Sequence, residues 1–232
     1  RPVSPKSIEQ QDIQALIRLR SKAIKDRTAC GNQLRGLLAE YGIVMNQGLS
    51  VLRRQIPVLL EDADNGLSTL FRELLAEGYA QLQELDRHIE RYNQKLAHWS
   101  RHHDACRRLQ TIPGFGSVVA SVFYSEVGDG RAYRRGRDVS AALGLVPKQH
   151  SSGGKDKLLG ISKRGNGYLR SLLVHGARSV VIRAEGKTDA LSRWVVRLKE
   201  KKGHNKAIVA LANKLARIGW VILHEQTVYK PV

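Results

Sequence analysis

Residues 67–99, LSTLFRELLAEGYAQLQELDRHIERYNQKLAHW, carry the clearest periodic pattern in the chain. Apolar residues return every three or four positions, and from Leu82 to Trp99 the steps are 3-4-3-4-3. This spacing places one apolar seam along a helix, as in a coiled coil. The stretch therefore predicts a long helix that packs its seam against another helix.

A second helical segment lies upstream. Residues 8–41 contain no Pro and carry a broken apolar stripe, with Ser4 and Ser7 as N-cap candidates and Gly42 as the expected stop. Residues 43–66 predict a connector with short helical pieces. Two long antiparallel helices would bury both stripes against each other. Pairing with a second copy of the chain would also bury them, and the sequence leaves both arrangements open.

The composition bounds the class of protein. The chain has 232 residues, of which 42% are hydrophobic, which is enough for a core and fits one or two domains. It contains no run of about 18 apolar residues, so we expect no membrane-spanning helix. It begins Arg1-Pro2-Val3 without Met, from which we expect a fragment or processed product without a secretory leader.

The thiols and histidines give little indication of a metal site. Two cysteines, Cys30 and Cys106, exclude a disulfide-rich scaffold and a four-cysteine zinc site. His98, His102 and Cys106 recur at steps of four and are expected on one helix face. Three ligands in line on one helix converge poorly on one ion, so a solvated face is the favoured interpretation and we predict no metal ligand.

The charge is concentrated in the second half. Residues 1–111 carry 17 Lys and Arg against 13 Asp and Glu, whereas residues 112–232 carry 22 against 8. The net charges are therefore +4 and +14. A basic second half indicates a polyanionic partner, above all nucleic acid, and no single amphipathic helix collects the charge for a membrane surface. We predict a helical dimerisation domain over residues 1–108 and a basic domain over 109–232.

Residues 109–116, Leu-Gln-Thr-Ile-Pro-Gly-Phe-Gly, resemble the turn of a helix-hairpin-helix element. Glycines at Gly114 and Gly116 would let backbone N–H groups at the start of the next helix face a phosphate. Such contacts hold a protein on a duplex without reading its sequence. An ordinary tight turn between packed helices is the alternative.

Further basic segments follow. Residues 131–137 form a basic turn that includes Arg134 and Arg135, before a short helix with Asp138 as its expected cap. In residues 160–170, Lys163, Arg164 and Arg170 lie at the mouth of a helix that Ser162 or Asn166 could cap. The last helix is expected over about 205–223, after a cluster of lysines between 199 and 206.

Residues 146–155, Val-Pro-Lys-Gln-His-Ser-Ser-Gly-Gly-Lys, do not fit a P-loop and predict a flexible loop. Such a loop would expose a serine hydroxyl beside Lys148, His150 and Lys155. These cations would stabilise charge on a phosphate under attack by the serine oxygen. A Gly/Ser-rich surface loop without chemistry is the alternative.

Taken together and in this order, the segments 112–116, 143–147, 151–155, 161–166 and 169–170 resemble one family. It is the family of insertion-sequence transposases that pair an acidic nuclease domain with a serine-bearing C-terminal domain, the bridge-RNA-guided DNA recombinases. Residues 7–11 and 34–38 resemble its coiled-coil segment, so the resemblance covers nearly the whole chain.

The resemblance implies a mechanism and partners. The family's serine attacks a DNA phosphodiester and forms a covalent link; the matching position is Ser152, with Ser151 as the neighbouring alternative. The family's acidic RNase H-like domain binds Mg²⁺ and precedes the coiled coil, and we expect it to be missing here, together with its cofactor. DNA, a structured guide RNA and self-association as a dimer or tetramer are the implied partners, in a prokaryotic cytoplasm at the nucleoid.

The expected fold is mainly α: long antiparallel coiled-coil helices followed by a compact helical domain with a helix-hairpin-helix element. The expected function is that of a DNA transposase, with the isolated chain binding nucleic acid but not completing strand transfer. The alternatives are a non-enzymatic helix-hairpin-helix module on a dimerising coiled coil and a scaffold that grips structured RNA.

Overall fold

A computed structural model describes residues 5–152 and 155–231, with the backbone alone for 150–152 and 155–158. Two compact units form within it: residues 15–95, and residues 96–232 together with 1–14. The predicted functional domains, a dimerisation domain over residues 1–108 and a basic domain over 109–232, remain a prediction. Over the described residues the helices are α1 (Ile8–Glu40), α2 (Leu49–Glu61), α3 (Thr69–His102), α4 (Asp104–Leu109), α5 (Ser117–Val127), α6 (Gly136–Ala142), α7 (Gly167–Ile182), α8 (Ala190–Lys202) and α9 (His204–His224).

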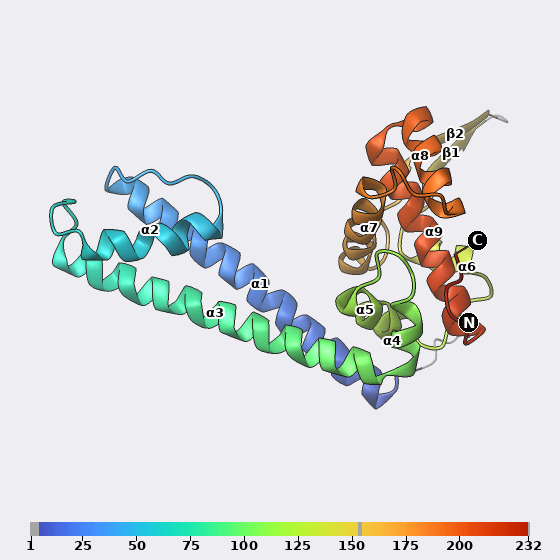
Figure 1. Ribbon diagram of the computed structural model, residues 1–232, viewed down its shortest axis with the longest axis horizontal. Helices are drawn as coiled ribbons and strands as arrows, with labels where there is room; N and C mark the ends of the chain where they lie inside the picture. The colour runs from blue at the N-terminus through green and yellow to red at the C-terminus, as the bar shows by residue number, and fades with distance from the viewer. Residues whose placement is uncertain (1–4, 153–154, 232) are drawn as a thin grey trace. The chain divides into compact units, whose positions relative to one another are not determined.

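The mainly α fold is confirmed, including the two long helices predicted at residues 8–41 and 67–99. In the unit of residues 15–95, α1 and α3 lie side by side with α2 beside them (Figure 1). One apolar cluster joins the three helices: Cys30, Leu34, Leu38, Leu52, Ile56, Leu67, Phe71, Leu75 and Leu82. Of the heptad seam, Leu82 lies in this cluster, Leu85 packs against it, and Ile89 and Leu96 are also buried.

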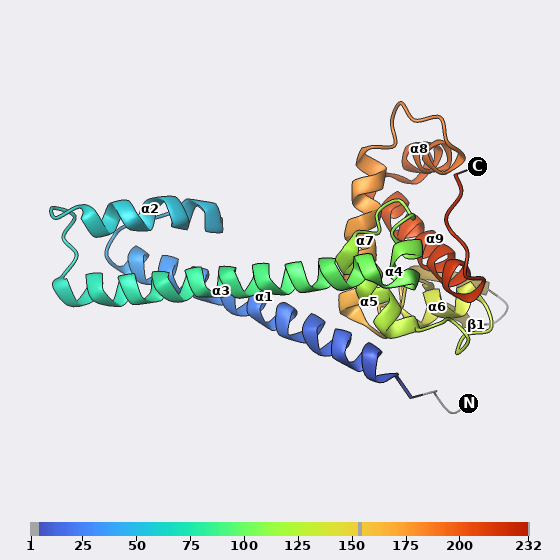
Figure 2. The same cartoon turned by 60° about the horizontal axis from the view of Figure 1, so that its bottom comes forward.

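The connector contains a longer helix than its Gly and Pro content predicts. α2 has 13 residues and includes Pro57, which lacks the N–H that would bond the carbonyl of Arg53. That carbonyl oxygen instead accepts a hydrogen bond of 3.2 Å from the Tyr79 hydroxyl of α3. Leu52 and Ile56 are fully buried. Tertiary partners therefore hold the helix across its proline, and Figure 2 shows α2 running beside α3.

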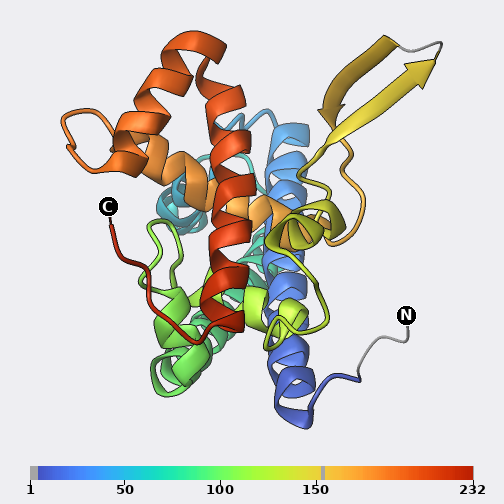
Figure 3. The same cartoon turned by 90° about the vertical axis from the view of Figure 1, so that its right-hand side faces the viewer.

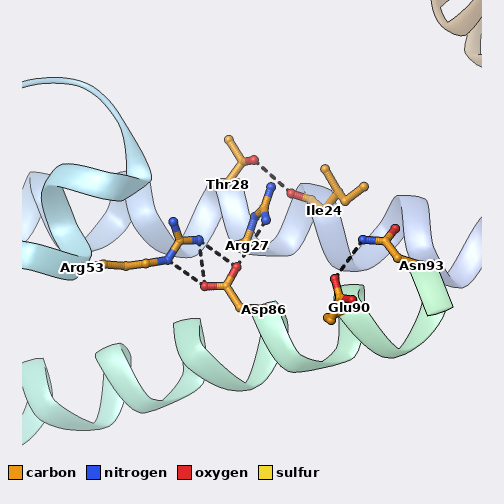
Figure 4. Close-up of polar contacts among 7 residues, drawn as sticks. All are labelled: Ile24, Arg27, Thr28, Arg53, Asp86, Glu90 and Asn93. Carbon is orange, nitrogen blue, oxygen red and sulfur yellow. Dashed lines mark hydrogen bonds and ion pairs between the residues drawn. The ribbon is translucent and has the colours of Figure 1, made fainter.

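A carboxylate ties the three helices together on their polar side. Asp86 of α3 accepts hydrogen bonds from Arg53 of α2 at 2.8 and 2.9 Å and from Arg27 of α1 at 3.2 Å (Figure 4). The Asp86 side chain is 28% exposed. Because two guanidinium groups share one partly sheltered carboxylate, this contact fixes the register of the helices better than an isolated surface pair.

In the other unit, α9 is the central helix and packs on α4, α6, α7 and α8. Its buried stripe includes Ile208, Leu211, Leu215 and Ile222, and its bounds agree with the helix predicted over about 205–223. Within the described residues α9 is also long and apolar enough to cross a membrane by length and composition, but half of its most apolar window is buried inside the unit. Core helices of water-soluble proteins share that property.

The helix predicted to carry His98, His102 and Cys106 is interrupted, so their placement on one helix was wrong. α3 ends at His102 and α4 starts at Asp104. Between them His103 is the N-cap of α4, and its Nδ1 accepts a 3.4 Å hydrogen bond from the backbone N–H of Cys106. Burial lowers the pKa of His103, which Glu9 partly offsets. Cys106 is fully buried, and burial raises the pKa of its thiol to about 12.

Candidate nucleic-acid interface

The predicted helix-hairpin-helix element forms from α4, the turn at residues 110–116 and α5. The turn is closed by hydrogen bonds from Phe115 N–H to the Ile112 carbonyl oxygen at 3.0 Å and from Ala120 N–H to that of Gly116 at 2.9 Å. Gly114 has φ +85°, a conformation that favours glycine. The backbone conformation of the turn is therefore sufficient to explain why glycine occurs at this position.

The two glycines of the turn differ in their surroundings. A Cβ on Gly114 would lie 2.7 Å from the carbonyl oxygen of Gly176 in α7, so Gly114 sits against another helix. Gly116 is the N-cap of α5, and a Cβ there would meet no atom within 4 Å. A phosphate-binding role for either residue remains a prediction.

Residues 146–155 are not the loop that the sequence predicted. β1 (Pro147–Ser152) and β2 (Lys155–Ile161) form an antiparallel hairpin that projects from its helical unit (Figure 3). Ser152 pairs with Lys155, and Ser151 with Asp156, at the far end of the hairpin. The side chains of Ser152 and Lys155 lie outside the described residues, as do Gly153 and Gly154. Lys148, nearer the base, is exposed.

Two of the short motifs meet at the base of this hairpin. The N–H of Ser162 donates to the carbonyl oxygen of Val146 at 2.8 Å, and that of Lys163 to the carbonyl oxygen of Gly144 at 3.1 Å. A Cβ on Gly144 would overlap the backbone of Arg164, and Gly144 has φ +66°. Segments 143–147 and 161–166 are therefore one structural feature, and it anchors the hairpin.

The cations predicted at the mouth of α7 divide into two groups. Lys163 and Arg164 are exposed. Arg170 instead donates from Nη1 to the carbonyl oxygens of Leu143 and Arg164, each at 3.0 Å, and so braces the hairpin base. Asn166 caps α7 by accepting from Leu169 N–H at 3.1 Å, which decides between the two predicted caps.

A groove of about 1220 Å³ lies between the hairpin base, α6, α8 and α9. It is lined by one face of α9, by Pro147, Leu159 and Ile161 of the hairpin, and by the start of α6. Among its described lining residues none is Asp or Glu, whereas five are cationic: Arg135, Arg137, Lys206, Lys214 and Arg217. Arg135 lines it, and so do Arg137 and Lys206 from the predicted basic segments, whereas Arg134 is exposed next to Arg135 in the chain.

The groove also contains two indole rings that sequence reasoning missed. Trp194 of α8 has the Lys214 ammonium 4.7 Å from its ring centroid. Trp220 of α9 donates from Nε1 to the Gly130 carbonyl oxygen at 2.9 Å and stacks on His224 with centroids 4.7 Å apart. The available signal for Trp220 was its helical spacing from Lys214 and Arg217, in steps of three residues.

No group of three or more His, Cys, Asp or Glu side chains that would hold a metal ion occurs in the described part of the chain. Glu185 of this unit pairs with Lys199 at 2.6 Å, and Asp189 accepts a hydrogen bond from the backbone N–H of Ser192. The described residues therefore do not fit a Mg²⁺ site, and we assign no step to a metal here.

Residues 106–193, which contain the turn, the hairpin and its base, match the Transposase IS116/IS110/IS902 family. The chain is 41% identical to a probable family 20 transposase of Pseudomonas aeruginosa, over the whole chain and 69% of that relative. The chain belongs to this transposase family. It is 44% identical to the transposase for insertion sequence element IS1111A of Coxiella burnetii and 37% identical to that for IS1328 of Yersinia enterocolitica.

The matches to these transposases extend beyond residues 106–193, the range that matches the family. Each of the IS1111A and IS1328 alignments covers 98% of the chain, so the helical unit of residues 15–95 is shared as well. The chain spans 63% of the length of the first of these relatives and 67% of the second. The activity and partners of a whole transposase are accordingly treated as proposals below.

Proposed function

We propose that this chain is the coiled-coil and serine-bearing part of a bacterial DNA transposase that cuts and rejoins DNA through Ser152. The observation that carries the proposal is the position of Ser152 at the far end of a hairpin. That hairpin projects from the unit that contains the family match (Figure 3). Exposed cations at Lys148, Lys163 and Arg164 surround its base and stem.

The chemistry is a transesterification. The Ser152 oxygen bonds to a backbone phosphorus, and the bond from that phosphorus to one sugar oxygen breaks. The hydroxyl proton leaves the serine, and the departing sugar oxygen takes up a proton, so charge and atoms balance. Because the phosphodiester is kept as a serine ester, rejoining needs no nucleotide cofactor. Nearby cations stabilise the charge that develops on the phosphate oxygens.

A guide RNA is the second part of the proposal, since the family resemblance implies RNA that pairs with target DNA. The net charge of +14 over residues 112–232 supports a polyanionic partner. The test is to purify the complete transposase from its bacterial host and sequence the nucleic acid that accompanies it. One discrete RNA encoded beside the gene supports guidance; bulk nucleic acid without an enriched species contradicts it.

We also propose self-association through the helical unit. Leu70 and Leu74, one turn apart on α3, are 66% and 52% exposed, although their neighbours Phe71 and Leu75 are buried. A dimer or tetramer that covers these leucines would remove apolar surface from water. We propose that the transposase acts on the chromosome in the bacterial cytoplasm.

The decisive test is a plasmid recombination assay with the complete transposase. Ser152→Ala should abolish recombination and leave DNA binding nearly intact, whereas Ser151→Ala should retain recombination. Full activity of Ser152→Ala would overturn the nucleophile assignment and favour the non-enzymatic DNA-binding alternative. Substituting a bulky residue at the open Gly116 should then be the change that weakens binding.

A further inference from the structure

The groove between α6, α8, α9 and the hairpin base has a chemical character that differs from the rest of the basic surface. Its lining includes the apolar side chains of Leu145, Val209, Ala210, Ile218 and Val221 and the two tryptophans. The same lining contains the five cationic side chains. A duplex presents phosphates and the edges of its bases to a protein, while the faces of the bases stay stacked inside. Apolar and aromatic surface matches the faces of bases that have no partner strand.

The groove is held open by contacts within the unit. Asn213 Nδ2 donates to the Leu145 carbonyl oxygen at 3.1 Å, and the Ser140 hydroxyl donates to the Asn213 carbonyl oxygen at 3.3 Å. These bonds fix α9 against α6 and the strand that enters the hairpin. Trp220 is fixed by its bond to Gly130. Because these groove residues are already fixed, less conformational entropy is lost when a ligand binds.

We propose that this groove binds a segment of unpaired DNA, with bases on the Trp194 and Trp220 side and phosphates on Lys206, Lys214 and Arg217. The proposal rests on the proposed function, because a transposase that exchanges strands exposes unpaired DNA. The groove adjoins the base of the hairpin that carries Ser152. A strand held there would lie at the base of the hairpin whose far end carries Ser152, so we assign the groove a positioning role.

The test compares binding of fluorescent oligothymidine of about 20 nucleotides, a duplex of equal length and oligouridine, at fixed salt of about 0.1 M. The measurement is fluorescence anisotropy with the 232-residue chain. Base–aromatic stacking predicts that Trp194→Ala weakens oligothymidine binding about 5- to 150-fold and duplex binding much less. Trp194→Phe, which keeps an aromatic face, should restore most of the affinity.

A matched pair of lysines tests the phosphate contacts without removing an aromatic ring. Lys214→Ala removes a groove cation, whereas Lys201→Ala removes an exposed cation of α8 that does not line the groove. Lys214→Ala should lower the slope of log affinity against log salt by about 0.7 for single strands. Lys201→Ala should leave it unchanged. Circular dichroism melting identifies any variant that fails to fold. If Trp194→Ala does not fold, the comparison of Lys214→Ala with Lys201→Ala tests the groove instead.

Three outcomes overturn the inference in distinguishable ways. If duplex and single strand bind equally and Trp194→Ala changes neither, the basic surface binds DNA but the groove does not take unpaired bases. If oligouridine binds more tightly than oligothymidine, the occupant is RNA rather than DNA. If no nucleic acid binds the folded chain, both the groove proposal and the proposed binding of nucleic acid by this unit are contradicted.

Discussion

Gly114 and Gly176 lie so close together that neither position accepts a side chain. A Cβ on Gly114 would lie 2.7 Å from the Gly176 carbonyl oxygen, and a Cβ on Gly176 would overlap the carbonyl oxygen of Gly114. The turn before α5 is thereby seated on α7. Because α7 also packs on α9, this contact connects the turn at residues 110–116 to the helix that lines the basic groove.

Gly176→Ala should destabilise the protein. The added methyl group has no space and forces α7 away from the turn, which costs about 1–3 kcal/mol. The matched control is Gly36→Ala on α1, where a Cβ meets nothing within 4 Å and the better helix former should stabilise by about 0.5–1 kcal/mol. Urea denaturation followed by circular dichroism measures both. Equal effects of the two substitutions would contradict the packing argument.

Asp86→Asn should lower stability by about 1 kcal/mol, since it removes the charge shared by Arg27 and Arg53 in a partly sheltered position. The control is Asp26→Asn, which breaks one exposed pair with Lys22 within α1 and should cost less than about 0.5 kcal/mol. The same denaturation experiment at low and high salt measures the difference. A larger loss for Asp26→Asn is the contrary result.

His103 makes stability depend on pH. Its folded-state pKa is below the ordinary value, chiefly because of burial, so the unfolded chain takes up the proton first. The stability that the neutral ring contributes is present above about pH 6.5 and declines as the pH falls through that value toward the folded-state pKa.

His103→Asn keeps an N-cap acceptor for α4 but cannot titrate, so it should flatten this decline. Melting temperatures across the range from about pH 5 to 7.5 provide the measurement. His98→Asn, at an exposed site on α3, is the control and should leave the decline in place. If His103→Asn melts with the wild-type pH dependence, the titrating group is elsewhere.

Both thiols should be unreactive in the folded chain. Cys30 and Cys106 are buried, and burial raises the pKa of each, that of Cys106 to about 12. Because the thiolate is the nucleophile, a colourless disulfide reagent that releases a dye should label them only as the chain unfolds. Labelling of either thiol within the mixing time under native conditions is the opposite outcome.

The heptad seam made the long helices predictable, because the 3-4 spacing of Leu82, Leu85 and Ile89 fits only a helix with one buried face. The same pattern could not choose a partner for the seam, which needed the tertiary contacts of α1 and α2. α2 is longer than the short helical pieces predicted for the connector, because Tyr79, distant in sequence, donates to the carbonyl oxygen that Pro57 leaves without its helical donor. The caps at Ser7 and Asn166 were readable because they depend on local bonds alone.

The candidate site was only partly readable. The polar residues of β1 lack the alternation of a strand, although the Gly153-Gly154 pair between two segments is a sequence signal for a hairpin. The basic groove joins Arg135 at the N-cap of α6, Trp194 of α8 and Lys214 of α9, and no local pattern brings them together. Arg170, predicted to contact nucleic acid, also donates to the Leu143 carbonyl oxygen, and no local sequence pattern indicates that tertiary contact.

The most direct test of the central claim is to trap the covalent intermediate. The complete transposase would be incubated with nicked recombination-site DNA that cannot be rejoined, digested with trypsin, and its DNA-linked peptide identified by mass spectrometry. We predict a nucleotide ester on Ser152 that is lost in Ser152→Ala and retained in Ser151→Ala. An ester on another residue, or recombination without any protein–DNA ester, would contradict the account.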